Sequence, residues 1–242
     1  MNANRVYRLA AHAAGILCRV LPAMACALLL AACASRVPPV PEVVPRETAE
    51  PRTVALLGAT GMVGGYLLEE ALAGGHRVRA LARSPAKLPA HDDRITVIQG
   101  DARDPRVVEE VVRGSDVVIS ALGPVRADGD AARSISTDAT ANVLRAMAVA
   151  GVSRYIVVSG GAVVMPGDER DLLGWWIRAL VRLGLESTLR DKQAEYESLA
   201  ASTVDWTLVR CPLIDPVPYR FAPLASLATP PAFRLRAGEL AR

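Results

Sequence analysis

A glycine-rich turn between an apolar run and a helical pattern constrains the fold of this chain more than any other feature. Residues 53–57 read TVALL, a continuous apolar and partly β-branched run that is typical of a strand buried on both faces of a parallel sheet. The segment GATGMVGG follows at residues 58–65, and apolar residues then recur at helical spacing up to Gly74 and Gly75. This order of strand, glycine-rich turn and helix predicts the first unit of a doubly wound parallel sheet.

The same alternation continues along the chain. Further strands are predicted over residues 77–82, 95–98, 116–122, 155–159 and 206–209, and further helices over 137–150, 172–183 and 189–200. We therefore expect one α/β domain over residues 52–242, a Rossmann-type fold with a six-stranded doubly wound parallel sheet and a short C-terminal substrate lobe.

The N-terminal residues resemble the signal of a bacterial lipoprotein. Residues 1–32 hold three arginines and no acid, end in an apolar run over 20–32, and are followed by Cys33. That run is shorter than the roughly 20 residues that a membrane-spanning helix needs, so a cleaved signal is the interpretation. The resemblance implies a lipid anchor at Cys33 in the outer membrane, and a cytoplasmic protein with a wrongly assigned start is the alternative. Residues 33–51 are proline-rich and predict an extended tether.

The charge balance argues against a nucleic-acid partner. The formal net charge is +3, and residues 1–32 account for it, which leaves 25 basic residues against 25 acidic ones. A neutral domain is unlike proteins that bind nucleic acid through a basic face. His76 and His91 have no cysteine or paired carboxylates at metal-ligand spacing, so no metal site is expected.

The glycine-rich turn has the composition of a phosphate-binding loop. Free N–H groups at the start of a helix bind a pyrophosphate, and side chains would block its approach. Gly58, Gly61 and Gly64 leave the backbone bare at that place, between a strand and a helix as a dinucleotide site requires. A tight turn without a ligand is the alternative.

The end of the second predicted strand indicates which nucleotide binds. NAD-binding folds place an acid there to hold a ribose hydroxyl, but no acid occurs from His76 to His91. Arg83 and Lys87 occur instead, and cations of this kind pair with a 2′-phosphate. The sequence therefore predicts NADP(H) in preference to NAD(H), with a solvated basic turn as the alternative.

Six segments occur in this order along the chain: GATGMVGG, LARSPAKLP, QGDARD, DVVISALGP, RYIVVSGGA and DWTLVRCP. Together they resemble the atypical short-chain dehydrogenase/reductases of the NAD(P)H-binding, NmrA-like group, above all its NADPH-dependent flavin and biliverdin reductases. The resemblance implies that Thr60, Met62 and Val63 join the phosphate loop, Asp101 and Ala102 flank the adenine, Leu122 and Gly123 line the ribose side, Arg126 reaches a phosphate, and Ser159 lies beside the nicotinamide. Beyond Pro212 we expect too few residues for the further strand and helix of these relatives.

The catalytic pair of typical short-chain dehydrogenases is missing. In that pair a lysine four positions after a tyrosine lowers the pKa of the phenol, and none of the five tyrosines here has such a lysine. A flavin or quinone needs less help, because NADPH passes hydride to a stacked acceptor whose proton comes from water. Ser159 is the candidate contact to the acceptor or the nicotinamide, and a polar residue closing a strand is the alternative.

These observations favour an NADPH-dependent reductase of a small planar acceptor that resembles a flavin or a quinone. The alternatives are a non-catalytic NAD(P)-binding redox sensor and a cofactor-free envelope lipoprotein that serves as a scaffold. Three minor expectations complete the analysis: Trp175 and Trp176 pack in the core, Asp168 belongs to a solvated acidic cluster, and Cys211 is a buried thiol.

Overall fold

The computed structural model describes residues 50–89, 92–169, 172–227 and 232–242. The predicted signal, Cys33 and nearly all of the tether lie outside these ranges. Within them, no helix combines the length and the apolar character that crossing a bilayer requires.

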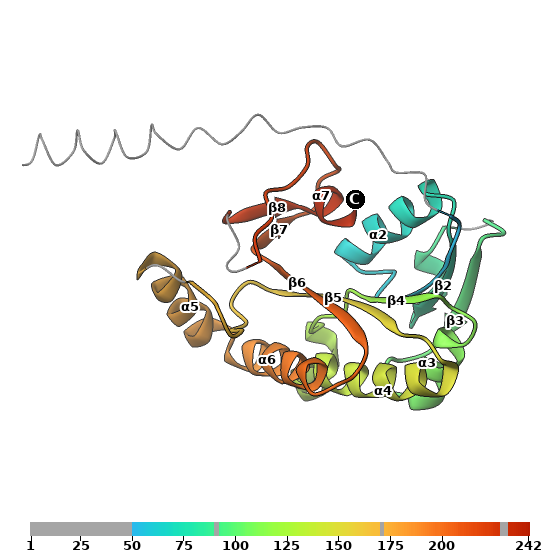
Figure 1. Cartoon of the computed structure of the whole chain (residues 1–242), viewed down its shortest axis with the longest axis horizontal. Coiled ribbons are helices and arrows are strands. Elements are labelled where there is room, and N and C mark those ends of the chain that lie inside the picture. The colour runs from blue at the N-terminus through green and yellow to red at the C-terminus, as the bar shows by residue number, and fades with distance from the viewer. Residues whose placement is uncertain (1–49, 90–91, 170–171, 228–231) are drawn as a thin grey trace, which may run out of the picture. The chain divides into compact units, whose positions relative to one another are not determined.

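A six-stranded, fully parallel sheet lies at the centre of the fold (Figure 1). Its strand order is β3-β2-β1-β4-β5-β6, so the winding reverses between β1 and β4 and the predicted doubly wound Rossmann-type sheet is confirmed. The strands are β1 (Thr53–Leu57), β2 (Arg77–Ala82), β3 (Ile95–Gln99), β4 (Val117–Ser120), β5 (Arg154–Gly160) and β6 (Asp205–Cys211).

Helices cover both faces of this sheet. Figure 1 shows α2 on one side and α3, α4 and α6 on the other. The bounds are α2 (Met62–Ala73), α3 (Pro105–Val112), α4 (Ile135–Ala150), α5 (Leu172–Gly184) and α6 (Glu186–Ala200), with short 3-10 segments η1 (Pro85–Lys87) and η2 (Arg126–Arg133).

Strand β1 contributes to two hydrophobic clusters, one on each face. Ala55 and Leu57 pack with residues of α3 and α4, whereas Val54 and Leu56 pack with Leu68 of α2. Successive strand residues point to opposite faces, so the unbroken apolar run TVALL is what a doubly covered strand requires.

Two local features differ from the prediction. Helix α3 was not predicted, although the Asp104 carboxylate accepts from the Arg106 N–H at 2.9 Å and Pro105 opens the helix, which are ordinary start signals. Strand β4 is shorter than residues 116–122, because Asp116 lies before it and its carboxylate accepts from the Thr53 N–H at 2.7 Å.

The C-terminal segment forms more structure than its length predicted. We expected too few residues here for the further strand and helix of the relatives, and the structure shows a short unit: β7 (Leu213–Asp215) pairs in parallel with β8 (Arg234–Arg236), and α7 (Ala237–Ala241) follows and packs against α2. An ion pair of 2.6 Å between Arg234 and Asp215 joins the two strands.

The tryptophans of α5 do not pack in the core. Trp175 is 68% exposed and Trp176 is 67% exposed, so that expectation is wrong. Helix α5 packs on α6 and lies beyond the carboxyl ends of β5 and β6, away from the sheet (Figure 1), which leaves these rings no core to enter.

Candidate nucleotide site

A pocket lies at the carboxyl ends of β1, β2 and β4, where the winding of the sheet reverses. Ligands of doubly wound sheets bind at this kind of position. Most of the nucleotide contacts expected from the sequence line the pocket together: Gly58, Thr60, Gly61, Arg83, Lys87, Asp101, Ala102, Leu122 and Gly123. The structure also brings Asp128, Val125 and Ile135 to the lining, and the sequence analysis named none of these.

The turn after β1 has a geometry that its glycines make possible. Gly58 has a φ of 86°, and a Cβ there would lie 2.9 Å from the Ala121 carbonyl oxygen. A Cβ on Gly64 would overlap the Gly58 carbonyl, because the first turn of α2 packs directly on the loop. Met62, Val63 and Gly64 form that first turn, which has no side-chain cap and no acid, so its N–H groups are available to an anion.

Arg83 is paired with an acid from a distant segment. Its Nη1 donates to both carboxylate oxygens of Asp128, at 2.6 and 2.7 Å. Lys87 lines the same pocket and forms no ion pair with any residue that the structure describes. No acid occurs in the sequence from His76 to His91, but the folded site contains one, because Asp128, 45 positions after Arg83, lies beside that arginine.

Asp101 lies in the pocket as a charged group. The Arg103 side chain donates to its carboxylate at 2.8 and 2.6 Å, and these hydrogen bonds lower the pKa of Asp101 to about 2. Ala102 is buried beside it, and its carbonyl accepts from the Asn142 amide at 3.0 Å.

Ser159 lies at the end of β5, outside the pocket lining. Its hydroxyl is buried and donates to Glu195 at 3.4 Å. Lys192 lies beside them and donates to Glu195 at 3.0 Å and to the carbonyls of Leu122 and Val158 at 3.0 and 3.2 Å. Because Leu122 lines the pocket, Lys192 connects the nucleotide site to Ser159.

The sequence analysis did not identify Lys192 or Glu195. Their spacing of three positions on α6 is common for exposed helical pairs, and Thr188 lies where the catalytic tyrosine of typical short-chain dehydrogenases would be. Burial raises the pKa of the Glu195 carboxyl, and the Lys192 ammonium opposes this shift.

Two other buried groups near this site are held in their neutral forms. Burial raises the pKa of the Tyr155 phenol, whose oxygen lies 3.3 Å from Thr140 Oγ1. Cys211 is a buried thiol, as expected from the sequence, and burial raises its pKa to about 12. Neither group is therefore ready to lose a proton near neutral pH.

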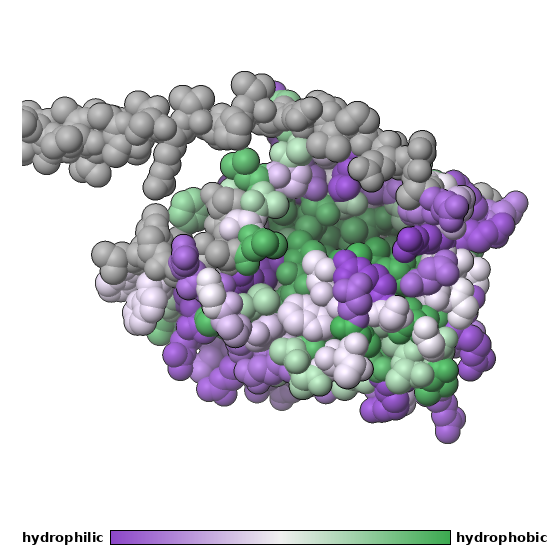
Figure 2. Space-filling model, viewed as in Figure 1, coloured by the Kyte–Doolittle hydropathy of each residue, from purple (hydrophilic) through white to green (hydrophobic). Residues whose placement is uncertain are grey.

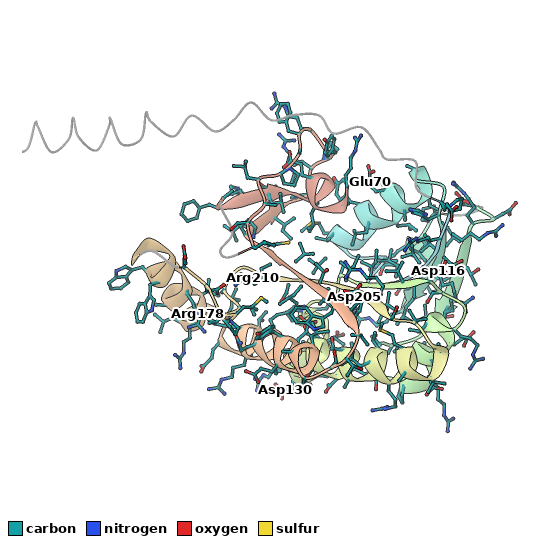
Figure 3. All side chains as sticks on the ribbon, viewed as in Figure 1. Glu70, Asp116, Asp130, Arg178, Asp205 and Arg210 are labelled. Carbon is teal, nitrogen blue, oxygen red and sulfur yellow. The ribbon has the colours of Figure 1, made fainter. Side chains whose placement is uncertain are left out.

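A loop over residues 161–169 follows β5 at the carboxyl edge. Asp168, expected in a solvated cluster, is instead buried in an ion pair of 2.7 Å with Arg210, because the end of β6 lies under this loop. Arg178 donates to the Ala162 carbonyl and Arg210 to the Val163 carbonyl, each at 3.1 Å, so arginines from α5 and from β6, both labelled in Figure 3, hold this loop. Figure 2 shows apolar residues lining a hollow in the middle of the face of the molecule that it draws.

Two predicted site residues are not located by the structure. Arg126 begins η2, but its side chain lies outside the described part of the chain, as does Cys33. Their roles stay predictions.

Sequence comparison identifies one matching family. The family described as NAD(P)H-binding matches residues 58–218. A 3 beta-hydroxysteroid dehydrogenase/Delta 5-->4-isomerase of Mycobacterium tuberculosis is 35% identical over 131 residues, which cover 50% of this chain and 35% of that protein. Cinnamoyl-CoA reductase 1 of Oryza sativa is 31% identical over 125 residues, which cover 48% of this chain and 37% of that protein. The chain thus spans little more than a third of the length of these relatives.

Solved structures share the fold at lower identity. A short-chain dehydrogenase/reductase from Veillonella parvula, in complex with NADP, aligns with a TM-score of 0.62 and 20% identity over 78% of this chain and 83% of that one. The anaerobillin reductase ChuY of Escherichia coli O157:H7 aligns with a TM-score of 0.60 and 21% identity over 78% and 86%.

Proposed function

Because the chain belongs to the NAD(P)H-binding family, we propose that it is a reductase that transfers hydride from NADPH to a small planar acceptor of the flavin or quinone class. The observation that carries this proposal is the pocket itself, which joins the bare turn after β1 to two cations, Arg83 and Lys87, at the end of β2. The turn suits a pyrophosphate and the cations suit a 2′-phosphate.

NADPH, when bound, supplies the hydride. The chain's own part is to bind and orient: the turn residues 58–64 hold the pyrophosphate, Arg83 and Lys87 hold the 2′-phosphate, and Leu122 and Gly123 line the ribose side of the pocket. Ser159 and Lys192 fix the carboxyl ends of β4 and β5 through buried hydrogen bonds.

The acceptor class follows from what the site offers for proton transfer. Reduction of an ordinary ketone needs an acid that gives a proton to the developing alkoxide. Tyr155 is fully buried with a raised pKa, and Lys192 is occupied by two carbonyls and Glu195. A flavin or quinone takes its proton from water, so it fits a site in which Tyr155 and Lys192 are not available as proton donors. The NADP complex of the Veillonella protein and the reductase activity named for ChuY support the same direction.

A redox sensor is the second candidate, and one observation favours it. The Ser159 hydroxyl is buried and turned to Glu195, so this candidate contact does not offer its proton to a substrate. Such a protein would bind the nucleotide and not turn it over.

The test is a titration of the purified full chain with NADPH and with NADH, followed by nucleotide fluorescence, and then a measurement of NADPH oxidation at 340 nm with FMN and with menadione. Saturable binding with turnover supports the reductase. Binding without turnover of either acceptor supports the sensor. A folded chain that binds neither nucleotide would overturn both and favour the scaffold.

A further inference from the structure

Arg83 already has a carboxylate partner in the pocket. Asp128 lies 2.6 and 2.7 Å from its Nη1, and the side chains are 46% and 14% exposed for Arg83 and Asp128 respectively. The acid is thus the more buried member, and it lies on the pocket wall. An incoming anion therefore meets an arginine whose charge is neutralised.

The backbone of η2 holds Asp128 in this position. Its N–H donates to the Val125 carbonyl at 2.9 Å, and Gly129 follows with φ 55° and ψ −131°, which turns the segment sharply. Val125 and Ile135, on either side of this turn, line the same pocket. The carboxylate is therefore placed by the segment as a whole and not by Arg83 alone.

The charged side chains of the lining are Asp101, Asp128, Arg83 and Lys87. Arg103 pairs with Asp101 and Arg83 pairs with Asp128, so Lys87 is the one lining cation without an acidic partner among the described residues. A 2′-phosphate carries close to two negative charges at neutral pH, so it is repelled by an acid that stays beside Arg83. A ribose with a free 2′-hydroxyl is neutral and experiences no such repulsion.

We propose that Asp128 is a specificity-determining residue that competes with the 2′-phosphate for Arg83 and so weakens the preference for NADPH over NADH. The inference rests on the proposed function, because it assigns a role within the same nucleotide site. When the 2′-phosphate binds, it replaces the Asp128 carboxylate as the partner of Arg83. NADH binds without breaking the Arg83–Asp128 pair.

The experiment compares the full chain with Asp128→Asn and with a matched control, Asp130→Asn. Asp130 lies in the same segment, is 88% exposed and pairs with Arg133 at 3.0 Å, so the control makes the same change in net charge without touching the pocket. The probes are NADPH, NADH, adenosine 2′,5′-bisphosphate and AMP, with Kd values from calorimetry, so the readout does not depend on turnover.

We expect Asp128→Asn to tighten the binding of NADPH and adenosine 2′,5′-bisphosphate by about 3- to 5-fold, near the upper limit for a partly exposed ion pair, and to change that of NADH and AMP by less than about 2-fold. Asp130→Asn should leave all four Kd values close to those of the wild type. In an Arg83→Gln background the effect of Asp128→Asn should be smaller than in the wild type, because the contested cation is gone and only the direct repulsion between the carboxylate and the 2′-phosphate remains. The comparison of Arg83→Gln with Arg83→Gln/Asp128→Asn also separates competition for Arg83 from a change in stability caused by Asp128→Asn alone.

The possible failures are distinguishable. If the folded wild type binds neither NADPH nor NADH, the proposed function is wrong and the role of Asp128 falls with it. If the wild type binds both, and the ratio of their Kd values is the same in the wild type, Asp128→Asn and Asp130→Asn, the proposed function stands and the role of Asp128 is wrong. Weaker binding of NADPH by the Asp128→Asn variant would also overturn the proposal, since it would indicate that Asp128 contacts the nucleotide favourably.

Discussion

Lys192 and Glu195 form a buried ion pair with an Nζ–Oε2 distance of 3.0 Å, and the same ammonium donates to Leu122 in the wall of the nucleotide pocket. Four acceptors, two carbonyls and two carboxylate oxygens, lie within 3.3 Å of Nζ. A buried charge pair is tolerated only when its hydrogen bonds are satisfied in this way. The pair therefore stabilises the edge of the sheet and also holds Leu122 in the wall of the pocket.

Replacing Lys192 by Met should destabilise the fold by about 3 kcal/mol, because it leaves the Glu195 carboxylate buried without its cationic partner. Burial already raises the pKa of Glu195. A carboxyl whose pKa is raised in the folded state lowers the free energy of unfolding as the pH rises above its pKa in the unfolded state. The destabilisation by Lys192→Met should therefore be larger at pH 8 than at pH 5. Urea unfolding at the two pH values measures this, and the double variant Lys192→Met/Glu195→Leu should recover most of the loss. Equal stability of Lys192→Met and the wild type at pH 8 would contradict the prediction.

Asp101→Asn should lower the free energy of unfolding at pH 7 by about 1 kcal/mol, a figure reduced for the partial exposure of the pair. The hydrogen bonds from Arg103 lower the pKa of Asp101 to about 2. Stability from a lowered pKa is present above the unfolded value near 3.8 and is lost as pH falls toward 2. Chemical unfolding at pH 7, 5 and 3 should thus show the two proteins converging at the acid end, and a constant difference would count against the ion pair.

Arg83→Ala should weaken NADPH by about 1 to 3 kcal/mol, as expected for loss of a charge-assisted contact, and should affect NADH far less. The arginine lines the pocket at the end of β2, where a 2′-phosphate would lie. Fluorescence titration of both nucleotides measures the two effects. Equal weakening of NADPH and NADH would show that Arg83 does not contact the 2′-phosphate.

Gly64→Ala should abolish nucleotide binding and lower the thermal midpoint, because the new methyl group would overlap the Gly58 carbonyl. Gly65→Ala is a matched control on the same helix, since a Cβ at Gly65 meets no atom within 4 Å. The control should bind normally and gain up to about 1 kcal/mol from the higher helix propensity of alanine. Calorimetry with NADPH and a thermal melt of each variant test the pair, and similar behaviour of both would remove the argument for the close approach at Gly64.

The predicted lipid anchor has its own test. In a Gram-negative host the wild type should incorporate radiolabelled palmitate and sediment with the outer membrane, whereas Cys33→Ser should incorporate none. Cys18→Ser, within the predicted signal, is the control and should label normally. An unlabelled wild type found in the cytoplasm would favour the wrongly assigned start, and it would place the protein where NADPH is abundant.

Much of the site was predictable because its parts are local. The turn from Gly58 to Gly64 lies within one strand-turn-helix unit, and its glycines are required by atoms a few residues away or by the adjacent strand end. Arg83 and Lys87 follow β2 directly, so their arrival at the same edge as the turn follows from parallel strand order. Helix α3 was missed although its start signals, Asp104 and Pro105, are local too.

The sequence by itself determined the alternation of strands and helices, the glycine turn after the first strand and the cations at the end of the second strand, because each depends on periodicity or on residues close in the chain. Only the tertiary structure decided that Arg83 meets Asp128, that Lys192 reaches Leu122 and Val158, and that Asp168 is buried. These partners are 45, 70, 34 and 42 positions apart and meet only where strand ends and loops converge at the carboxyl edge of the sheet. No pattern along the chain encodes such pairs, because hydrophobic periodicity specifies which face of an element is buried but not which charged group comes to lie beside another.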